Sequence, residues 1–180
     1  MSVLDIRLIP LDETHLDEVD ALMTDPDVLR FTRFPSPPDP EFPKQWLDRY
    51  EQGRLDGSRE GFAAVTTDGG FVGVALAPHI DAEAREVELG YIVAPELRGK
   101  GVATELLRQL TTWAFDRLGA LRAQLLIDVD NVASQQVAQR AGYQLEGVMR
   151  STHLKGDVRT DTQIWSRLPS DPQPGVASPS

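Results

Sequence analysis

Cysteine is absent from the 180 residues of the chain. Its absence excludes disulfide bonds, thiolate metal sites and any acyl group carried on a thiol of the protein. The sequence also lacks an apolar run approaching the roughly 20 residues that cross a bilayer. Its first residues, MSVLDIRL, lack the basic and then apolar order of a signal peptide. We therefore expect a cytoplasmic protein with no membrane partner and no metal site.

Basic residues are outnumbered: 18 Lys and Arg stand against 28 Asp and Glu, for a formal net charge of −10. Binding to nucleic-acid phosphates depends on a positive surface, so we expect no nucleic-acid partner. An acidic surface favours cationic partners, but it also simply keeps a protein dispersed. The 41% of hydrophobic residues suffices for the core of one domain.

Apolar periodicity and turn residues predict an α/β (α+β) chain in which strands alternate with helices. Five prolines between residues 31 and 43 predict a loop there. We expect one domain over residues 1–168 and a disordered tail, rich in Pro, Ser and Gly, over residues 169–180. The expected strands are residues 3–9, 61–67, 71–76, 86–93, 122–129, 143–149 and 160–168, and the expected helices run through residues 16–22, 46–50, 101–118 and 131–140.

A strand, a glycine-containing turn and a helix start follow one another between Glu88 and Thr104. The first amides of a helix have no intrahelical acceptor, and glycine lets an anion approach the backbone, so this junction predicts a phosphate cradle. Two common phosphate loops do not fit it. Lys100 lies between Gly99 and Gly101, which is not the Walker A spacing. Thr104 stands where the third glycine of the dinucleotide motif belongs.

The junction resembles the pyrophosphate motif of the GCN5-related N-acetyltransferase (GNAT) superfamily, which is Arg or Gln, two residues, Gly, one residue, then Gly or Ala. Arg98, Gly101 and Ala103 fill it. The later family pattern, Asn, two residues, Ser or Ala, then Gly with Phe or Tyr, is met by Asn131, Ser134 and Gly142 with Tyr143, in that order. The continuation Glu146-Gly147-Val148-Met149-Arg150 resembles the ribosomal-protein N-terminal (Rim-type) branch. The resemblance covers residues 3 to 168.

This resemblance implies a mixed, mostly antiparallel sheet of six to seven strands flanked by about four helices, with the fourth and fifth strands splayed for acetyl-CoA. It also implies direct transfer of acetyl to a primary amine, where proximity supplies much of the rate. The amides from Arg98 to Thr104 would hold the pyrophosphate, and Asn131 and the strand end would hold the pantetheine arm. The residues implied in binding acetyl-CoA are Ile92, Val93, Arg98, Gly99, Lys100, Gly101, Val102, Ala103, Thr104, Asn131 and Ser134.

Three residues are candidates for proton transfer. By resemblance, Glu88 is a base whose pKa burial would raise; the alternative is a solvated strand carboxylate. Many relatives carry a tyrosine acid at the position of Ala138, and the Rim-type branch uses the serine that corresponds to Ser134 instead; the alternative is a helix-capping serine. His153 lies where this branch can carry a base, or it is an ordinary strand histidine.

The resemblance favours a protein N-terminus as the acceptor, and a small amine such as a polyamine or an antibiotic is the close alternative. Phe31, Arg33 and Phe34 of the proline-rich loop are candidates to shape its pocket, unless the loop only faces solvent. A noncatalytic acyl-CoA-binding or sensing domain is the alternative function, which the loss of a tyrosine at Ala138 favours. A nucleotide hydrolase would need an acidic Mg²⁺ site, and the sequence places none, so we do not expect this function. Exposed edge strands are compatible with a homodimer.

Overall fold

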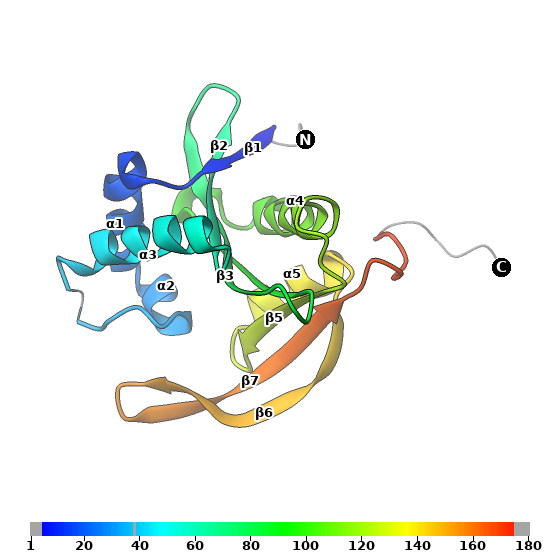
Figure 1. Ribbon diagram of the computed structural model, residues 1–180. Coiled ribbons are helices and arrows are strands. Elements are labelled where there is room, and N and C mark those ends of the chain that lie inside the picture. Colours follow the sequence, from blue (N-terminus) through cyan, green and yellow to red (C-terminus); the bar gives the residue numbers. More distant parts are fainter. Residues whose placement is uncertain (1–4, 38, 175–180) are drawn as a thin grey trace.

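The computed structural model describes residues 5–37 and 39–174, and a seven-stranded sheet runs through it (Figure 1). The strands lie in the order β1-β2-β3-β4-β5-β7-β6, and every neighbouring pair is antiparallel except β4 and β5. Over the described residues, no helix is long and apolar enough to span a membrane. The strands are β1 (Ile6–Pro10), β2 (Glu60–Thr66), β3 (Phe71–Asp81), β4 (Glu86–Val93), β5 (Arg122–Asp128), β6 (Gln144–Lys155) and β7 (Val158–Arg167).

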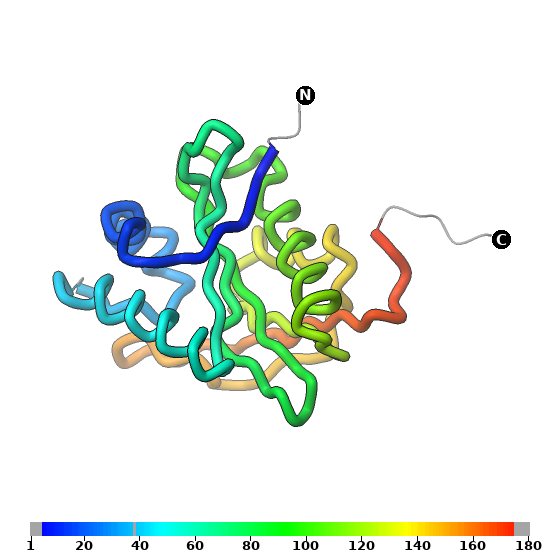
Figure 2. The backbone as a smooth tube through the Cα atoms, turned by 45° about the horizontal axis from the view of Figure 1, so that its top comes forward, coloured from blue at the N-terminus to red at the C-terminus, as the bar shows by residue number. Residues whose placement is uncertain are grey.

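Helices cover both faces of the sheet (Figures 1 and 2). One face carries α1 (Leu16–Thr24), α2 (Pro26–Phe31) and α3 (Phe42–Asp56), which pack on β2 and β3. The other carries α4 (Val102–Asp116) and α5 (Val132–Arg140). Short 3₁₀ turns, Glu13–His15 and Pro95–Leu97, precede α1 and follow β4.

Strand β4 contributes to the cores on both faces because its side chains alternate. Val87 and Leu89 are buried with Leu107 and Leu110 of α4. Ile92 packs against the core on the α1–α3 face. The strand is therefore sandwiched between both helical layers, and groups at its end are close to both.

Strands β4 and β5 pair only over their first three residues, from Glu86 opposite Arg122 to Glu88 opposite Gln124. Beyond that point β5 pairs with β7 alone, along its whole length, and β4 stays on β3. The expected splay of the fourth and fifth strands is therefore confirmed. It leaves the edge of β4 from Leu89 onward without a neighbouring strand.

The sequence prediction was wrong in three places. It missed α2, which begins where Asp25 caps the helix and Pro26 occupies the first turn. With α2 the described residues hold five α-helices rather than about four. Strand β3 was expected to end at residue 76, before Pro78, but a register shift between Leu76 and His79 lets it continue to Asp81.

The C-terminal hairpin is also longer than expected. Strand β6 was expected to end at residue 149 and instead reaches Lys155, beyond a register shift between Met149 and His153. Its tip reaches the N-terminal helices (Figures 1 and 2). The tail expected over residues 169–180 stays a prediction: residues 175–180 lie outside the described part, and Asp171 accepts a hydrogen bond from the Leu168 amide.

Candidate active site

The turn before α4 presents backbone amides to an open space. Gly99 and Gly101 have φ values of 73° and 81°, which favour glycine, and a Cβ on either would meet nothing within 4 Å. The amides from Gly99 to Thr104 donate to no backbone or side-chain acceptor among the described residues. Unpaired amides at the start of a helix attract anions, so this turn fits a pyrophosphate.

The side chains of the same turn have other partners. Arg98 donates from Nε to the Val93 carbonyl at 3.1 Å and from Nη2 to Asp25 at 2.9 Å, and its own amide donates to the Pro95 carbonyl. Lys100 Nζ donates to the Glu96 carbonyl at 2.9 Å. Arg98 thus connects the end of β4 to the start of α2, and the unpaired amides of the turn begin at Gly99.

Asn131 and Ser134 lie at the start of α5, which follows β5. Asn131 caps the helix, since its Oδ1 accepts from the Ser134 amide at 3.1 Å. The Ser134 hydroxyl makes no hydrogen bond with the described residues. Its partner-free hydroxyl is compatible with the predicted catalytic role and does not serve as the cap.

Glu88 is half-buried on β4, opposite His79 of β3, at the last residue pair before β4 and β5 separate. Burial raises the pKa of its carboxyl, and the positive charges of Arg33, His79 and Arg59 offset part of that rise. A carboxylate with a raised pKa binds a proton more readily at neutral pH than an ordinary one does. The environment therefore suits a base.

His153 lies on β6, and its Nε2 is buried without a hydrogen-bond partner among the described residues. Burial lowers its pKa, as do the charges of Arg33 and Lys155, while Asp128 acts in the opposite direction. A neutral imidazole with an unpaired nitrogen can also accept a proton. Arg33 acts on both Glu88 and His153, so these two candidate bases share one charged environment.

The β6–β7 hairpin is fastened to the proline-rich loop. Lys155 Nζ donates to the carbonyls of Thr32 at 3.1 Å and Phe34 at 2.5 Å. Arg33 lies between these two residues and makes no ion pair among the described residues. The hairpin thus fixes the loop that carries the exposed Arg33 side chain.

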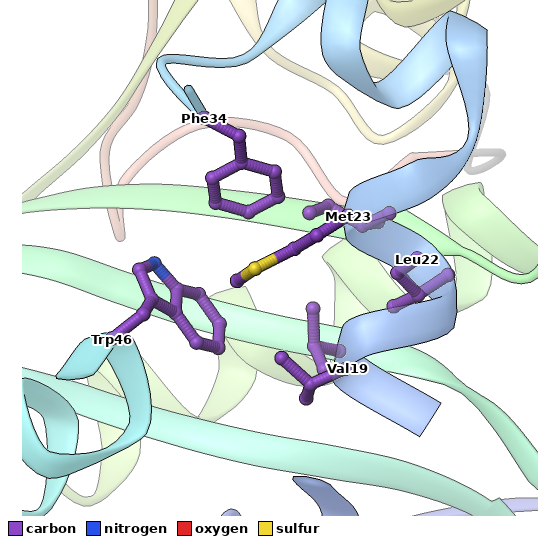
Figure 3. A pocket seen from close by; sticks show the side chains of 7 residues that line it. Val19, Leu22, Met23, Phe34 and Trp46 are labelled. Carbon is purple, nitrogen blue, oxygen red and sulfur yellow. The ribbon is translucent and has the colours of Figure 1, made fainter. Parts of the chain in front are cut away.

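An apolar recess lies beneath this loop, between α1, α3 and the sheet (Figure 3). Met23 extends from α1 to the space between Phe34 and Trp46, whose rings meet edge-on with centroids 5.8 Å apart. The recess is too small to hold a water molecule. Ile92, expected to contact acetyl-CoA, forms part of its wall, so it supports the loop from the sheet side.

Sequence reasoning missed several residues of this region. Nothing in the sequence distinguishes Tyr91, whose buried hydroxyl lacks a partner among the described residues. Lys155 and Asp128 were missed because their partners are distant in sequence. Over the described residues no cluster of three or more His, Asp or Glu could hold a metal ion.

Comparison with known proteins places the chain among acetyltransferases. The family described as "Acetyltransferase (GNAT) domain" matches residues 5–144. A putative ribosomal N-acetyltransferase, YdaF, of Bacillus subtilis (strain 168) is 32% identical over 59% of this chain and 58% of its own length. Spermidine N(1)-acetyltransferase of Escherichia coli (strain K12) is 27% identical over 86% of this chain and 81% of its own. The chain spans about half the length of these curated relatives, 58% of YdaF and 46% of the uncharacterized N-acetyltransferase YoaA of the same organism.

Solved structures agree with the fold. The RimL ribosomal α-N-protein acetyltransferase in complex with coenzyme A superimposes with a TM-score of 0.84 at 20% identity, over 93% of this chain and 95% of that one. A spermidine N-acetyltransferase from Vibrio cholerae, in complex with CoA and spermine, gives 0.82 at 20% identity, over 93% and 97%. The family match over most of the chain, the splayed β4–β5 pair and the open amides before α4 together show that the chain belongs to the GNAT acetyltransferase family.

Proposed function

We propose that this protein transfers the acetyl group of acetyl-CoA directly to a primary amine. The observation that carries the proposal is the turn from Gly99 to Thr104, where unpaired amides and two glycines leave room for a pyrophosphate beside the opening between β4 and β5. Bound acetyl-CoA would supply an activated thioester. The chain supplies the groups that position it and move protons.

The protons can be assigned to two groups. When the amine nitrogen bonds to the acetyl carbon and the carbon–sulfur bond breaks, the amine gives up a proton. Glu88, or else His153, accepts it and passes it to solvent. The Ser134 hydroxyl donates a hydrogen bond to the departing sulfur, which then takes one proton from solvent and leaves as a thiol. The overall count of protons therefore balances without a covalent enzyme intermediate.

We favour the α-amine of a protein N-terminus as the acceptor. An α-amine has a pKa of about 8, against about 10.4 for an alkyl amine of the lysine type, so much more of it is neutral near pH 7. Arg33 and Arg59 also place positive charge near Glu88, which disfavours a polycation such as spermidine at this point. The ribosomal N-acetyltransferase relative is compatible with this acceptor, and the spermidine N-acetyltransferase relatives keep the polyamine as the alternative.

The test is release of coenzyme A thiol from acetyl-CoA across a panel of acceptors. The panel contains peptides with a free N-terminus, the same peptides with a formylated N-terminus, spermidine, and aminoglycosides. We expect turnover with the free peptides and none with their formylated controls. Turnover with spermidine alone would support the transferase activity but would identify a polyamine, rather than a protein N-terminus, as the acceptor. Calorimetric binding of acetyl-CoA without turnover on any acceptor would favour the noncatalytic acyl-CoA sensor.

We also infer a homodimer through β6. This strand is an open edge of the sheet, and Leu145, Val148 and Leu154 on it are about half exposed. A second copy would cover this edge. Light scattering should give a dimer mass that Val148→Lys reduces to a monomer, whereas Leu55→Lys, at the most exposed leucine of α3, should leave it unchanged. A monomeric wild-type protein at assay concentrations would refute this inference.

A further inference from the structure

Tyr91 has a buried hydroxyl that takes no part in the proton transfers proposed for Glu88, His153 and Ser134. It lies on β4, three residues after Glu88, on the strand face that packs against α4 and α5. The hydroxyl makes no hydrogen bond with the described residues and has no contact with solvent. Burial raises the pKa of this phenol to about 12. A buried polar group without a partner destabilises the folded state, so its presence calls for an explanation.

Ser134 of α5 lies on the same side of the sheet as this hydroxyl. Ser134 lies one turn before Ala138 on the same side of α5, and Ala138 is fully buried in the core cluster against which Tyr91 packs. The Ser134 hydroxyl acts on the Tyr91 phenol, lowering its pKa against the larger effect of burial. The two hydroxyls do not yet form a hydrogen bond in this structure, and neither has another partner among the described residues.

A serine in the first turn of a helix has a competing choice. Its hydroxyl hydrogen can turn back to a backbone carbonyl of the preceding residues, where it is lost to chemistry. A donor placed on the serine oxygen fixes the hydroxyl in one orientation. Tyr91 is such a donor at every working pH, because its raised pKa keeps the phenol protonated.

We propose that Tyr91 is a positioning residue, whose hydroxyl donates to the Ser134 oxygen and so directs the Ser134 hydrogen into the opening between β4 and β5. The inference rests on the proposed role of Ser134. Tyr91 gives up no proton and touches no reacting atom. Many relatives carry a tyrosine at the position of Ala138 on α5. In this chain that position has only a methyl group, and the nearby phenol is that of Tyr91 on β4.

The test combines Tyr91→Phe, Ser134→Ala and the double variant. We expect Tyr91→Phe to lower kcat about tenfold while the KM for acetyl-CoA stays within about twofold, because the hydrogen bond matters only as charge develops on sulfur. In the Ser134→Ala background the same change should have no further effect, since there is no hydroxyl left to position. The free energy of unfolding should fall by less than in Tyr143→Phe, because the Tyr91 and Ser134 hydroxyls form no hydrogen bond within normal distance in this structure.

Tyr143→Phe is the matched control. Tyr143 is also buried near α4 and α5, but its hydroxyl is 2.7 Å from that of Thr111. Removing it should lower the free energy of unfolding and leave kcat unchanged. This contrast separates loss of a structural hydrogen bond from loss of a positioning one.

A second readout needs no acetyl-CoA. The chain has three tyrosines, so ¹³C labelling at Cζ gives three signals that the Phe variants assign. Ser134→Ala should shift the Tyr91 signal and raise its pKa, while the signal of Tyr50, which lies in the core on the other face, stays in place.

The outcomes separate this inference from the proposed function. If Ser134→Ala lowers kcat and Tyr91→Phe does not, the positioning role is refuted and the role of Ser134 stands. If the two effects simply add in the double variant, Tyr91 acts independently of Ser134 and the inference also fails. If Ser134→Ala leaves kcat unchanged, the proposed role of Ser134 fails first and the positioning role fails with it.

Discussion

Arg98 and Asp25 form an ion pair, 2.9 Å from Nη2 to Oδ1, that joins the turn before α4 to the N-cap residue of α2. The same guanidinium also donates to the Val93 carbonyl at the end of β4. The turn that is open to a pyrophosphate is therefore attached both to the strand beside the opening and to the helices of the proposed acceptor side. In this structure the Arg98 guanidinium is hydrogen-bonded to Val93 and Asp25, so it fixes the position of the turn.

Arg98→Met should lower both stability and affinity for acetyl-CoA. The half-buried guanidinium makes charge-assisted hydrogen bonds, so we expect a loss of about 2 kcal/mol in the free energy of unfolding. The dissociation constant for acetyl-CoA, measured by calorimetry, should rise because the turn is no longer held.

Asp25→Asn distinguishes this structural role from direct phosphate binding. Asn keeps the cap on the Val28 amide but removes the charge that pairs with Arg98. We expect the free energy of unfolding to fall and the dissociation constant for acetyl-CoA to rise, both by less than in Arg98→Met. If Arg98→Met weakens acetyl-CoA binding while Asp25→Asn leaves both quantities unchanged, the guanidinium contacts the phosphates directly.

The glycine turn before α4 and the sheet could be predicted from the sequence because their signals are local. Gly99 and Gly101 lie between an apolar strand and an amphipathic helix, and the backbone geometry of such a turn leaves the first amides of the helix unpaired. Residues 146–150 likewise form a local motif, which resembles the Rim-type branch. Only the structure gives Glu146 a physical role, as the partner of Arg122.

The remaining parts could not be predicted because they depend on pairs that are far apart in sequence. Arg98 and Asp25 are separated by 73 residues, and Lys155 and Thr32 by 123. Helix α2 was missed since it has only six residues, too few for a periodic pattern, and a proline within its first turn. The unpaired hydroxyl of Tyr91 likewise follows from tertiary packing.

Gly101→Ala should weaken acetyl-CoA binding by more than its effect on stability explains. A side chain at φ 81° costs about 1–2 kcal/mol of backbone strain. The added methyl also enters the space in front of the unpaired amides. We expect the dissociation constant for acetyl-CoA to rise at least about tenfold, which corresponds to about 1.4 kcal/mol.

Gly57→Ala is the control for this variant. Gly57 has a φ of 77° and equal open space, but it ends α3 rather than starting α4. It should lose a similar free energy of unfolding and keep its affinity for acetyl-CoA. Equal losses of affinity in both variants would mean that strain alone, and not the cradle, accounts for the effect.

The fall of kcat at low pH, the acid limb of its pH profile, should identify the base. A base must be deprotonated to act, so activity falls as pH drops through its pKa, and burial of Glu88 moves that limb above the ordinary value of 4.5. Glu88→Gln should lower kcat by about 10²–10⁴ and remove the limb. Steady-state rates between pH 4.5 and 8 provide the measurement.

Two neighbours separate Glu88 from His153. Arg59 lowers the pKa of Glu88, so Arg59→Met should move the limb to higher pH if Glu88 is the base. Asp128 raises the pKa of His153, so Asp128→Asn should move the limb to lower pH if His153 is the base. A limb that responds to Asp128→Asn and not to Arg59→Met would assign the role to His153.

Arg122 of β5 joins three strands at the end of the sheet where β4 and β5 still pair. It contacts Glu86 of β4 at 2.8 Å and both oxygens of Glu146 on β6, at 2.6 and 2.7 Å. The hydrogen bonds from Arg122 and Ser166 lower the pKa of Glu146 to about 2. A carboxyl with a lowered pKa stabilises the fold above its unfolded pKa, and this contribution is lost as pH falls towards 2.

Glu146→Gln should therefore lower the free energy of unfolding at pH 7 by about 1 kcal/mol, a small value because the pair is partly exposed. The difference from wild type, measured by urea unfolding, should narrow below pH 4.5, because the carboxyl of the unfolded wild-type chain is then protonated while that of the folded protein stays charged until about pH 2. Glu83→Gln, on an exposed turn without a hydrogen bond among the described residues, should match wild type throughout. A Glu146→Gln difference that stays constant down to pH 3 would mean that packing of the side chain, and not its charge on Arg122, stabilises this end of the sheet.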